Sequence, residues 1–290
     1  MADEIYRLIA IDLDGTLLSP TGKVTQRTRA AIQGVLSSGY MVCFATGRNF
    51  TESRSILEAV EHFDHAVFVS GAMVMDTRQH VTLHRTLMDP ELARQISALL
   101  ESLGHAVHAL QDTGRTGVDY LISDNIPQTF ATQQWLNATQ CTVHHRSDLA
   151  TADHEHTMRL SIVATQEQID EAMEKLTARF GSRIVTHNIV VPAFDLQLLE
   201  IFDPAVNKWE GILHVARHHG IEPSQIIAIG DDVNDIHMIR HAGLGVAMGN
   251  ARPEVRAAAR LIIDSNADDG LAQFLEKLSS GQLRVQDPAR

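Results

Sequence analysis

The stretch Leu8-Ile9-Ala10-Ile11-Asp12-Leu13-Asp14-Gly15-Thr16 joins a short apolar run to two carboxylates, a glycine and a threonine. The apolar run predicts a buried β-strand. Carboxylates at the end of such a strand are costly to bury unless a neighbouring charge compensates them. A hard cation does so because it prefers oxygen ligands, and an aspartate is also a possible nucleophile. A solvated turn is the alternative, because Asp and Gly are frequent turn residues.

Outward from this stretch, strand and helix patterns alternate as in a parallel sheet with crossover helices. The rhythm breaks near residue 86, where a helix and several β-like pieces form a segregated α+β pattern, and it resumes at residue 195 with a strand expected over 196–201. We therefore expect an α/β fold with a Rossmann-like parallel sheet core and an inserted α+β cap domain. The expected core comprises residues 1–85 and 195–290, and the expected cap comprises residues 86–194, a normal domain size.

The bulk composition excludes several classes of protein. The 290-residue chain has a formal net charge of −12 and an isoelectric point near 5.7, which argues against an electrostatic grip on nucleic acid or an anionic membrane. No apolar run approaches the roughly 18 residues of a membrane span. The start of the chain is acidic where a signal peptide is basic, so a cytoplasmic location is expected.

Three further strings carry polar groups at predicted strand or helix ends. Thr46-Gly47-Arg48 follows the second strand, where a hydroxyl and backbone N–H groups suit a phosphoryl oxygen; a plain strand-to-helix turn is the alternative. Lys208 begins a helix, a position that the macrodipole disfavours unless an anion is near. Residues 230–235, Gly-Asp-Asp-Val-Asn-Asp, place three carboxylates directly after an apolar strand in the chain, which indicates a metal or phosphate site.

In this order, the four strings resemble the four motifs of the haloacid dehalogenase superfamily, and the long insertion between the second and third resembles its Cof-type branch with a large α/β cap. The resemblance runs from about residue 6 to 278 and implies Mg²⁺-dependent hydrolysis of small-molecule phosphate monoesters through an aspartyl-phosphate. The expected substrate is a sugar phosphate, pyridoxal phosphate or a similar metabolite. It implies no nucleic-acid or membrane partner.

The resemblance also implies roles, residue by residue. Asp12 is the expected nucleophile and Asp14 the expected general acid and base. The expected metal ligands are Asp12, Asp14 through its backbone carbonyl, and Asp231. Asp235 is expected either to support the metal site without binding the ion directly or to orient Lys208. The residues expected to bind phosphate are Thr46, Gly47, Lys208 and Asn234.

Substrate specificity is expected to depend on Arg48 and Ser70 in the core and on His187 and Asn188 in a turn of the cap. Ser70-Gly71-Ala72 stands where many Cof-type members have Asn-Gly-Ala, and Trp209 stands where the family usually has Gly. Two other functions stay open: a phosphomutase or phosphotransferase on sugar phosphates, and a phospho-acceptor signalling domain. A long insertion and an acid for a leaving group argue against the signalling domain.

Overall fold

The computed structural model describes residues 6–191 and 195–282, and these form two compact units. The core unit contains the chain up to Arg48, the segment Ser53–His84 and the chain from Asn207 onward. The inserted unit contains Arg85–Val206 together with the short segment Asn49–Glu52. Apart from that short segment, the inserted unit is one continuous stretch of chain between two parts of the core unit.

The core unit is built on a parallel sheet of short strands. Except for the exposed edge strand Leu261–Ile262, these apolar strands are buried on both faces, as in parallel sheets that helices cover. A parallel bridge between Ala45 and Val67 continues the sheet toward a second, three-stranded sheet. In spatial order the strands of the five-stranded sheet are β14 (Leu261–Ile262), β13 (Leu244–Ala247), β12 (Ile226–Gly230), β1 (Leu8–Ile11) and β2 (Met41–Phe44); the second sheet has β3 (His65–Phe68), β4 (Met73–Asp76) and β5 (Val81–Arg85).

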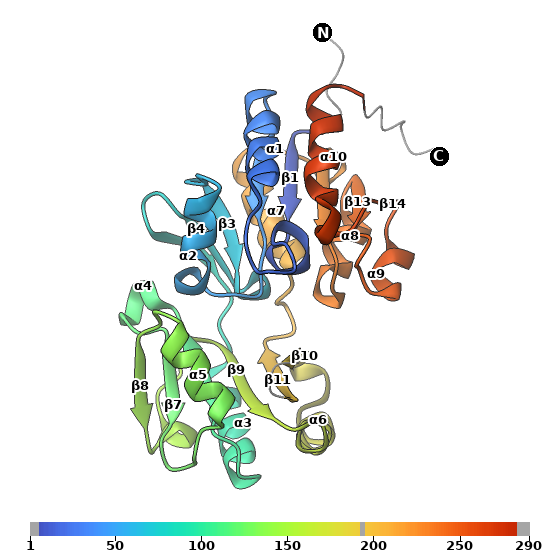
Figure 1. Ribbon diagram of the computed structural model, residues 1–290. Helices are drawn as coiled ribbons and strands as arrows, with labels where there is room; N and C mark the ends of the chain where they lie inside the picture. The colour runs from blue at the N-terminus through green and yellow to red at the C-terminus, as the bar shows by residue number, and fades with distance from the viewer. Residues whose placement is uncertain (1–5, 192–194, 283–290) are drawn as a thin grey trace. The chain divides into compact units, whose positions relative to one another are not determined.

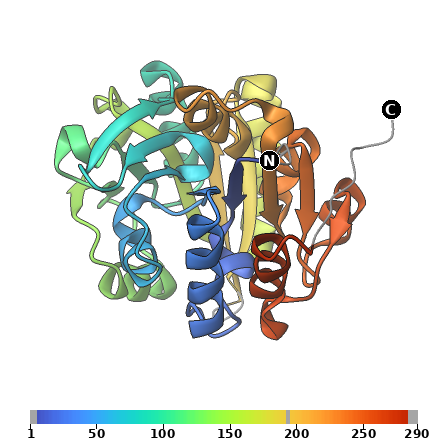
Figure 2. The same ribbon diagram turned by 90° about the horizontal axis from the view of Figure 1, so that it is seen from above.

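Helices cover both faces of the core sheet. Figure 2 shows α1 and α10 side by side on one face and α7 with α8 on the other. The first helix begins where Thr25 caps it, since the Thr25 hydroxyl accepts a hydrogen bond from the Thr28 amide at 3.1 Å. The helices of this unit are α1 (Gln26–Ser37), α2 (Phe50–Ala59), α7 (Lys208–His218), α8 (Ile236–His241), α9 (Pro253–Ala258) and α10 (Gly270–Ser279).

The strand order creates a switch point in the middle of the core sheet. Strand β1 lies between β2, which follows it in the chain, and β12, which comes after the inserted unit. The chain therefore leaves β1 in one direction and later returns on its other side. In open α/β sheets, ligands bind in the crevice outside the carboxyl ends of the strands at such a point, and here those ends belong to β1 and β12.

The inserted unit has its own six-stranded sheet and its own core (Figure 1). Helices α3 and α6 bury their apolar faces with this sheet in one cluster, in which Ile96, Leu160, Ile169 and Leu176 are fully buried. The strands in spatial order are β10 (Val185–Val191), β11 (Leu196–Phe202), β9 (Thr157–Ala164), β6 (His108–Gln111), β7 (Tyr120–Ser123) and β8 (Val143–Arg146); the helices are α3 (Pro90–Ser102), α4 (Thr113–Thr116), α5 (Phe130–Ala138) and α6 (Gln166–Phe180).

Two details differ from the sequence-based expectations. The strand expected over 196–201 as part of the core is β11, which pairs with β9 and β10, so the inserted unit extends to Val206 instead of ending at residue 194. The expected turn at His187 and Asn188 is wrong, because both residues lie inside the continuous strand β10 opposite Glu200 and Leu199. Polar side chains in the middle of a strand mimic a turn when the sequence is read alone.

No helix within the described residues is both long and apolar enough to cross a membrane.

Candidate active site

Asp12 lies at the switch point, directly after β1. Its amide donates a hydrogen bond to the carbonyl of Ile229, at 3.0 Å, so the parallel pairing of β1 with β12 continues into Asp12. Ile11 is in register with Ile229, so Asp12 and the acidic segment that follows Gly230 lie at the same edge of the sheet. Strand pairing alone therefore brings Asp12 close to Asp231, which lies 219 positions later in the chain.

Two glycines leave space for carboxylates from other parts of the site. A Cβ at Gly15, whose φ is +78°, would lie 2.1 Å from Oδ2 of Asp231. A Cβ at Gly230 would lie 2.4 Å from the carboxyl carbon of Asp235. A side chain at either position would therefore displace a carboxylate. The close approach of an acid thus explains both glycines, and Gly15 in addition has the left-handed conformation that favours glycine.

Lys208, at the first position of α7, joins two of these carboxylates. Its Nζ atom donates to Oδ1 of Asp12 and to Oδ1 of Asp235, each at 2.6 Å, and its side chain is 1% exposed. The other oxygen of Asp235 accepts hydrogen bonds from the amides of Asp231 and Asp232, at 2.9 and 3.1 Å. Asp235 thus fixes both the lysine and the backbone of the acidic loop.

A close backbone approach sets the start of α7 and hence the place of Lys208. Gly71 has φ +106°, and a Cβ there would lie 2.0 Å from the carbonyl oxygen of Asn207. Asn207 caps the helix through its side chain, which accepts from the Glu210 amide at 3.1 Å. A larger residue at position 71 would therefore move the helix start that carries the lysine.

The charges at the site are unbalanced. Burial, reinforced by the neighbouring carboxylates Asp235 and Asp231, raises the pKa of Asp12 well above its ordinary value against the opposing effect of Lys208. Burial and Asp235 raise the pKa of Asp231 to about 7. Burial disfavours the charged form of Lys208, but Asp12 and Asp235 outweigh it and raise the pKa of the lysine. One ammonium group thus faces three carboxylates, and a further positive charge would stabilise their ionised forms.

The donor set fits a hard divalent cation such as Mg²⁺. Asp12, Asp231 and Asp235 each offer a carboxylate oxygen, and these atoms lie within 4.8 Å of one another. All three donors are oxygen, which is what Mg²⁺ prefers. Both oxygens of the fully buried Asp235 accept hydrogen bonds of 3.1 Å or less from Lys208 and two backbone amides. The hydrogen bond from Asn250 to Oδ2 of the partly exposed Asp231 is longer, at 3.3 Å, so Asp12 and Asp231 are the better candidates for direct ligands.

Asp14 and Arg48 form an ion pair at the open side of the site. Nε and one terminal nitrogen of Arg48 donate to the two carboxylate oxygens of Asp14 at 2.8 and 2.6 Å. Their side chains are 55% and 37% exposed, respectively. Pairs with such exposure contribute only about 0–1 kcal/mol, so a ligand can separate them at little cost. The sequence did not predict this contact.

A second group of polar residues faces Gly47. A Cβ at Gly47 would lie 3.4 Å from Oγ of Ser70 and 3.9 Å from Nδ2 of Asn234. Among the described residues, the buried Ser70 Oγ and Asn234 Oδ1 have no hydrogen-bond partner. Ser70 also has φ +55°, a left-handed conformation that few residues other than Gly, Asn and Asp adopt readily. Nearby, the hydroxyl oxygen of the buried Thr46 accepts from the Arg48 amide at 3.1 Å.

Two further residues complete the surroundings of Asp231. Thr16 donates its hydroxyl to Oδ1 of Asp231 at 2.9 Å. Asn250 donates Nδ2 to the Gly15 carbonyl at 2.9 Å and to Oδ2 of Asp231 at 3.3 Å. Sequence reasoning gave neither residue a role. The available signal for Asn250 was its place just after β13, since polar residues at carboxyl ends of neighbouring strands share one edge.

The structure thus groups the predicted residues by unit. The core unit brings Asp12, Asp231, Asp235 and Lys208 into one cluster, and Gly47, Ser70 and Asn234 into another. His187 and Asn188 belong to the inserted unit, where the His187 ring lies 5.2 Å from that of Phe202.

Comparisons with known proteins find similar sequences over nearly the whole chain. The profile of the haloacid dehalogenase-like hydrolase family matches residues 9–275. A 5-amino-6-(5-phospho-D-ribitylamino)uracil phosphatase from Bacillus subtilis is 28% identical over 275 residues, covering 94% of this chain and 97% of the relative. An HMP-PP phosphatase from Cronobacter sakazakii is 28% identical over 255 residues, covering 87% of each chain.

Solved structures show the same fold. A haloacid dehalogenase-like hydrolase from Bacteroides thetaiotaomicron superposes with a TM-score of 0.79 at 21% identity, covering 94% of this chain and 99% of the other. A sugar phosphatase of haloacid dehalogenase subclass IIB gives a TM-score of 0.76 at 20% identity, covering 94% and 98%. The predicted fold class, a parallel-sheet core with an additional domain, is confirmed.

Proposed function

Because this chain belongs to the haloacid dehalogenase-like hydrolases, we propose that it hydrolyses phosphate monoesters of small metabolites, with Asp12 as the nucleophile and Mg²⁺ as the cofactor. The family membership confirms the predicted enzyme class, a phosphoric monoester hydrolase. The observation that carries the detailed proposal is the buried Asp12 at the switch point, hydrogen-bonded to Lys208 and facing Asp231. A carboxylate in this place has no evident packing role.

The chain's own residues supply the two chemical steps. A carboxylate oxygen of Asp12 attacks phosphorus; the new Asp12 O–P bond forms as the bond from phosphorus to the leaving oxygen breaks. Asp14 donates a proton to that oxygen, because an alkoxide is a poor leaving group. Asp14 then takes a proton from water, the water oxygen attacks phosphorus, and the Asp12 O–P bond breaks to release phosphate and restore the carboxylate.

Lys208 and the Gly47 cluster bind the transferring group in this proposal. Lys208 places a buried positive charge beside Asp12, where it stabilises the charge on the phosphoryl oxygens. The unpartnered amide oxygen of Asn234 shows that its side chain is not committed elsewhere in the described structure, and its Nδ2 is free to turn toward a phosphoryl oxygen. Thr46 and Gly47 would complete this group with hydroxyl and backbone donors.

Mg²⁺ would be held by Asp12, Asp231 and the backbone carbonyl of Asp14. When bound, it cancels repulsion between the carboxylates and a dianionic phosphate and polarises a phosphoryl oxygen. The all-oxygen donor set and the raised pKa values of Asp12 and Asp231 support this assignment. Asp235 would act through Lys208 and the loop backbone, both of which it contacts.

We further propose that the inserted unit is a cap that selects the substrate. Its support is topological: the chain runs out of β5 into the inserted unit and returns at α7, whose first residue is Lys208. The sequence and size of a unit attached at this point can vary without breaking the parallel sheet of the core unit. His187 and Asn188 remain candidates for substrate contacts from this unit, and Arg48 and Ser70 from the core unit. The phosphatases with matching sequences suggest a phosphorylated metabolite of modest size.

The test is a phosphate-release screen of the full-length protein over phosphorylated metabolites, with and without Mg²⁺. We expect turnover with Mg²⁺, loss of turnover after dialysis against a chelator, and at least a ~10³-fold loss in the Asp12→Asn variant, which is about 4 kcal/mol of barrier. Rapid acid quench followed by mass spectrometry should detect one phosphoryl group on wild-type Asp12. A folded Asp12→Asn variant within tenfold of the wild-type rate would refute the nucleophile assignment.

The same screen separates the two other functions. A phosphomutase would interconvert sugar phosphate isomers without releasing phosphate. A signalling domain would keep its phosphoryl group for minutes and show no turnover.

A further inference from the structure

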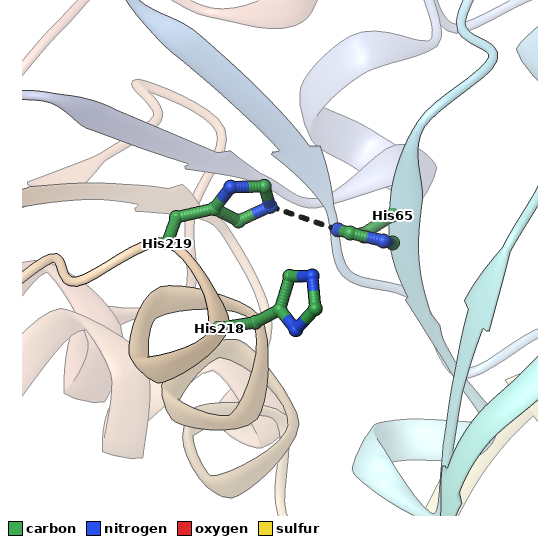
Figure 3. A group of neighbouring side chains, drawn as sticks. All are labelled: His65, His218 and His219. Carbon is green, nitrogen blue, oxygen red and sulfur yellow. Dashed lines mark hydrogen bonds between the residues drawn. The ribbon is translucent and has the colours of Figure 1, made fainter.

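Three histidines meet at the other end of helix α7, away from Asp12. His65 is the first residue of β3, His218 is the last residue of α7, and His219 follows it (Figure 3). Each offers one ring nitrogen, and these nitrogens lie within 4.8 Å of one another. Since Lys208 begins the same helix, ten residues at 1.5 Å each place His218 about 15 Å along α7 from the catalytic lysine. The cluster is therefore a separate feature of the core unit.

The rings already face one another at distances close to those of metal ligands. Nδ1 of His65 and Nε2 of His219 are 2.9 Å apart and share a hydrogen bond. The His218 ring lies edge-on to both, with centroids 5.1 Å from His65 and 5.0 Å from His219. Around a tetrahedral Zn²⁺ with Zn–N bonds of 2.0–2.1 Å, ligand nitrogens stand about 3.4 Å apart. Because the three nitrogens lie within 4.8 Å of one another, no pair has to close by more than about 1.4 Å to reach that spacing.

Groups of both charge signs lie near the three rings. His218 and His219 lie at the C-terminus of α7, where the helix macrodipole and the last carbonyls stabilise positive charge. The Asp64 carboxylate lies 3.5 Å from Nδ1 of His65. Arg7, which donates to the Gly220 carbonyl at 3.0 Å, and Arg217, the residue before His218, oppose a cation.

We propose that His65, His218 and His219 form a binding site for Zn²⁺ or a similar borderline transition-metal cation, which joins β3 to α7. Three imidazole nitrogens leave one position of a tetrahedral site for water, and the exposed His218 gives the ion a route from solvent. The histidine cluster offers imidazole nitrogens, which suit a borderline cation such as Zn²⁺, whereas the Asp12 cluster offers only oxygen atoms. The two sites should therefore select different cations. This proposal does not depend on the proposed function, and its test does not use activity.

The experiment uses the full chain, freed of metal by a chelator and then kept in excess Mg²⁺ so that the oxygen site is occupied. Co²⁺ is titrated in as a spectroscopic probe for Zn²⁺, and visible absorption reports tetrahedral coordination. We expect one Co²⁺ per chain with tetrahedral-type absorption, displacement of it by Zn²⁺, and a rise in melting temperature with Zn²⁺. His65→Gln, His219→Gln and the exposed-site variant His218→Gln should each weaken binding by at least ~100-fold, because each removes one of three ligands.

His241→Gln is the matched control. His241 stacks with His237 one helical turn away, at a centroid distance of 6.0 Å, so this pair could hold metal without a third ring. Binding that survives in His241→Gln but is lost in His65→Gln supports the proposed site. Three results would overturn it: no tetrahedral Co²⁺ signal in the wild type, loss of binding in His241→Gln, or unchanged binding in His65→Gln, which would indicate a site made by α7 alone.

Discussion

Replacing Gly15 by Ala tests whether the position of the Asp231 carboxylate controls activity. A Cβ at Gly15 would lie 2.1 Å from Oδ2 of Asp231 and 2.6 Å from its carboxyl carbon. The obstructing atoms are the end of a side chain, so Asp231 can rotate away and the fold can survive. Rotation would break its hydrogen bonds with Thr16 and Asn250 and move a predicted metal ligand by an ångström or more.

The chain offers a matched control in Gly22. Gly15 and Gly22 have φ of +78° and +71°, but nothing lies within 4 Å of a Cβ built at Gly22. The left-handed conformation should therefore cost both Ala variants about 1–2 kcal/mol of stability. Only Gly15→Ala should lose activity, by at least ~100-fold in kcat/KM, which is about 3 kcal/mol and is the effect expected of a 1 Å misplacement.

The assay is phosphate release at several Mg²⁺ concentrations, with urea unfolding of the wild type and both variants. Gly15→Ala should require more Mg²⁺ than Gly22→Ala at equal stability. If the two variants have equal kcat/KM within threefold, the packing of Asp231 against Gly15 does not set the active geometry, and the reasoning fails.

Three other predictions follow from the same structure. Lys208→Met should lower the free energy of unfolding by about 3 kcal/mol, because it leaves two buried carboxylates without their lysine partner. Adding Asp235→Asn should restore much of the stability but not the activity. An active Lys208→Met enzyme would contradict the proposed role of the lysine. Ser70→Ala should not reduce stability, because the hydroxyl is buried without a hydrogen-bond partner. It should change the ratio of kcat/KM values between metabolite substrates by ~10-fold, while kcat/KM for a minimal aryl phosphate changes less. Equal changes for both kinds of substrate would show that Ser70 does not determine specificity. Burial lowers the pKa of His108 from 6.5 to about 4, so on acidification this histidine is protonated in the unfolded chain before it is protonated in the folded protein. The free energy of unfolding should therefore fall by up to about 3 kcal/mol as the pH drops from 6.5 to about 4. In urea titrations at each pH, His108→Gln should flatten this part of the dependence of stability on pH, and an unchanged slope would show that other groups cause it.

The amino-acid sequence alone predicts most of the local elements and the residue types that gather at the candidate site. The apolar run Leu8–Ile11 forms the predicted buried strand, because a short apolar run is a local signal. The acids of the first and fourth strings follow apolar strands, and strand ends in a parallel sheet meet at one edge. The cluster of Asp12, Asp231 and Lys208 was therefore accessible to reasoning without coordinates, although the roles assigned to these residues stay predictions.

The pairing of segments that are distant in the chain becomes visible only in the folded protein. Leu196–Phe202 has the same pattern whichever sheet it joins, and its pairing with β9 and β10 places it in the inserted unit. The contacts of Arg48 with Asp14, of Asn250 with Asp231, and of His65 with His219, 154 residues away, depend on the directions of side chains after the chain has folded. A sequence specifies the types of residue and their local periodicity, but packing of whole elements sets which side chains face each other, and no local signal records that choice.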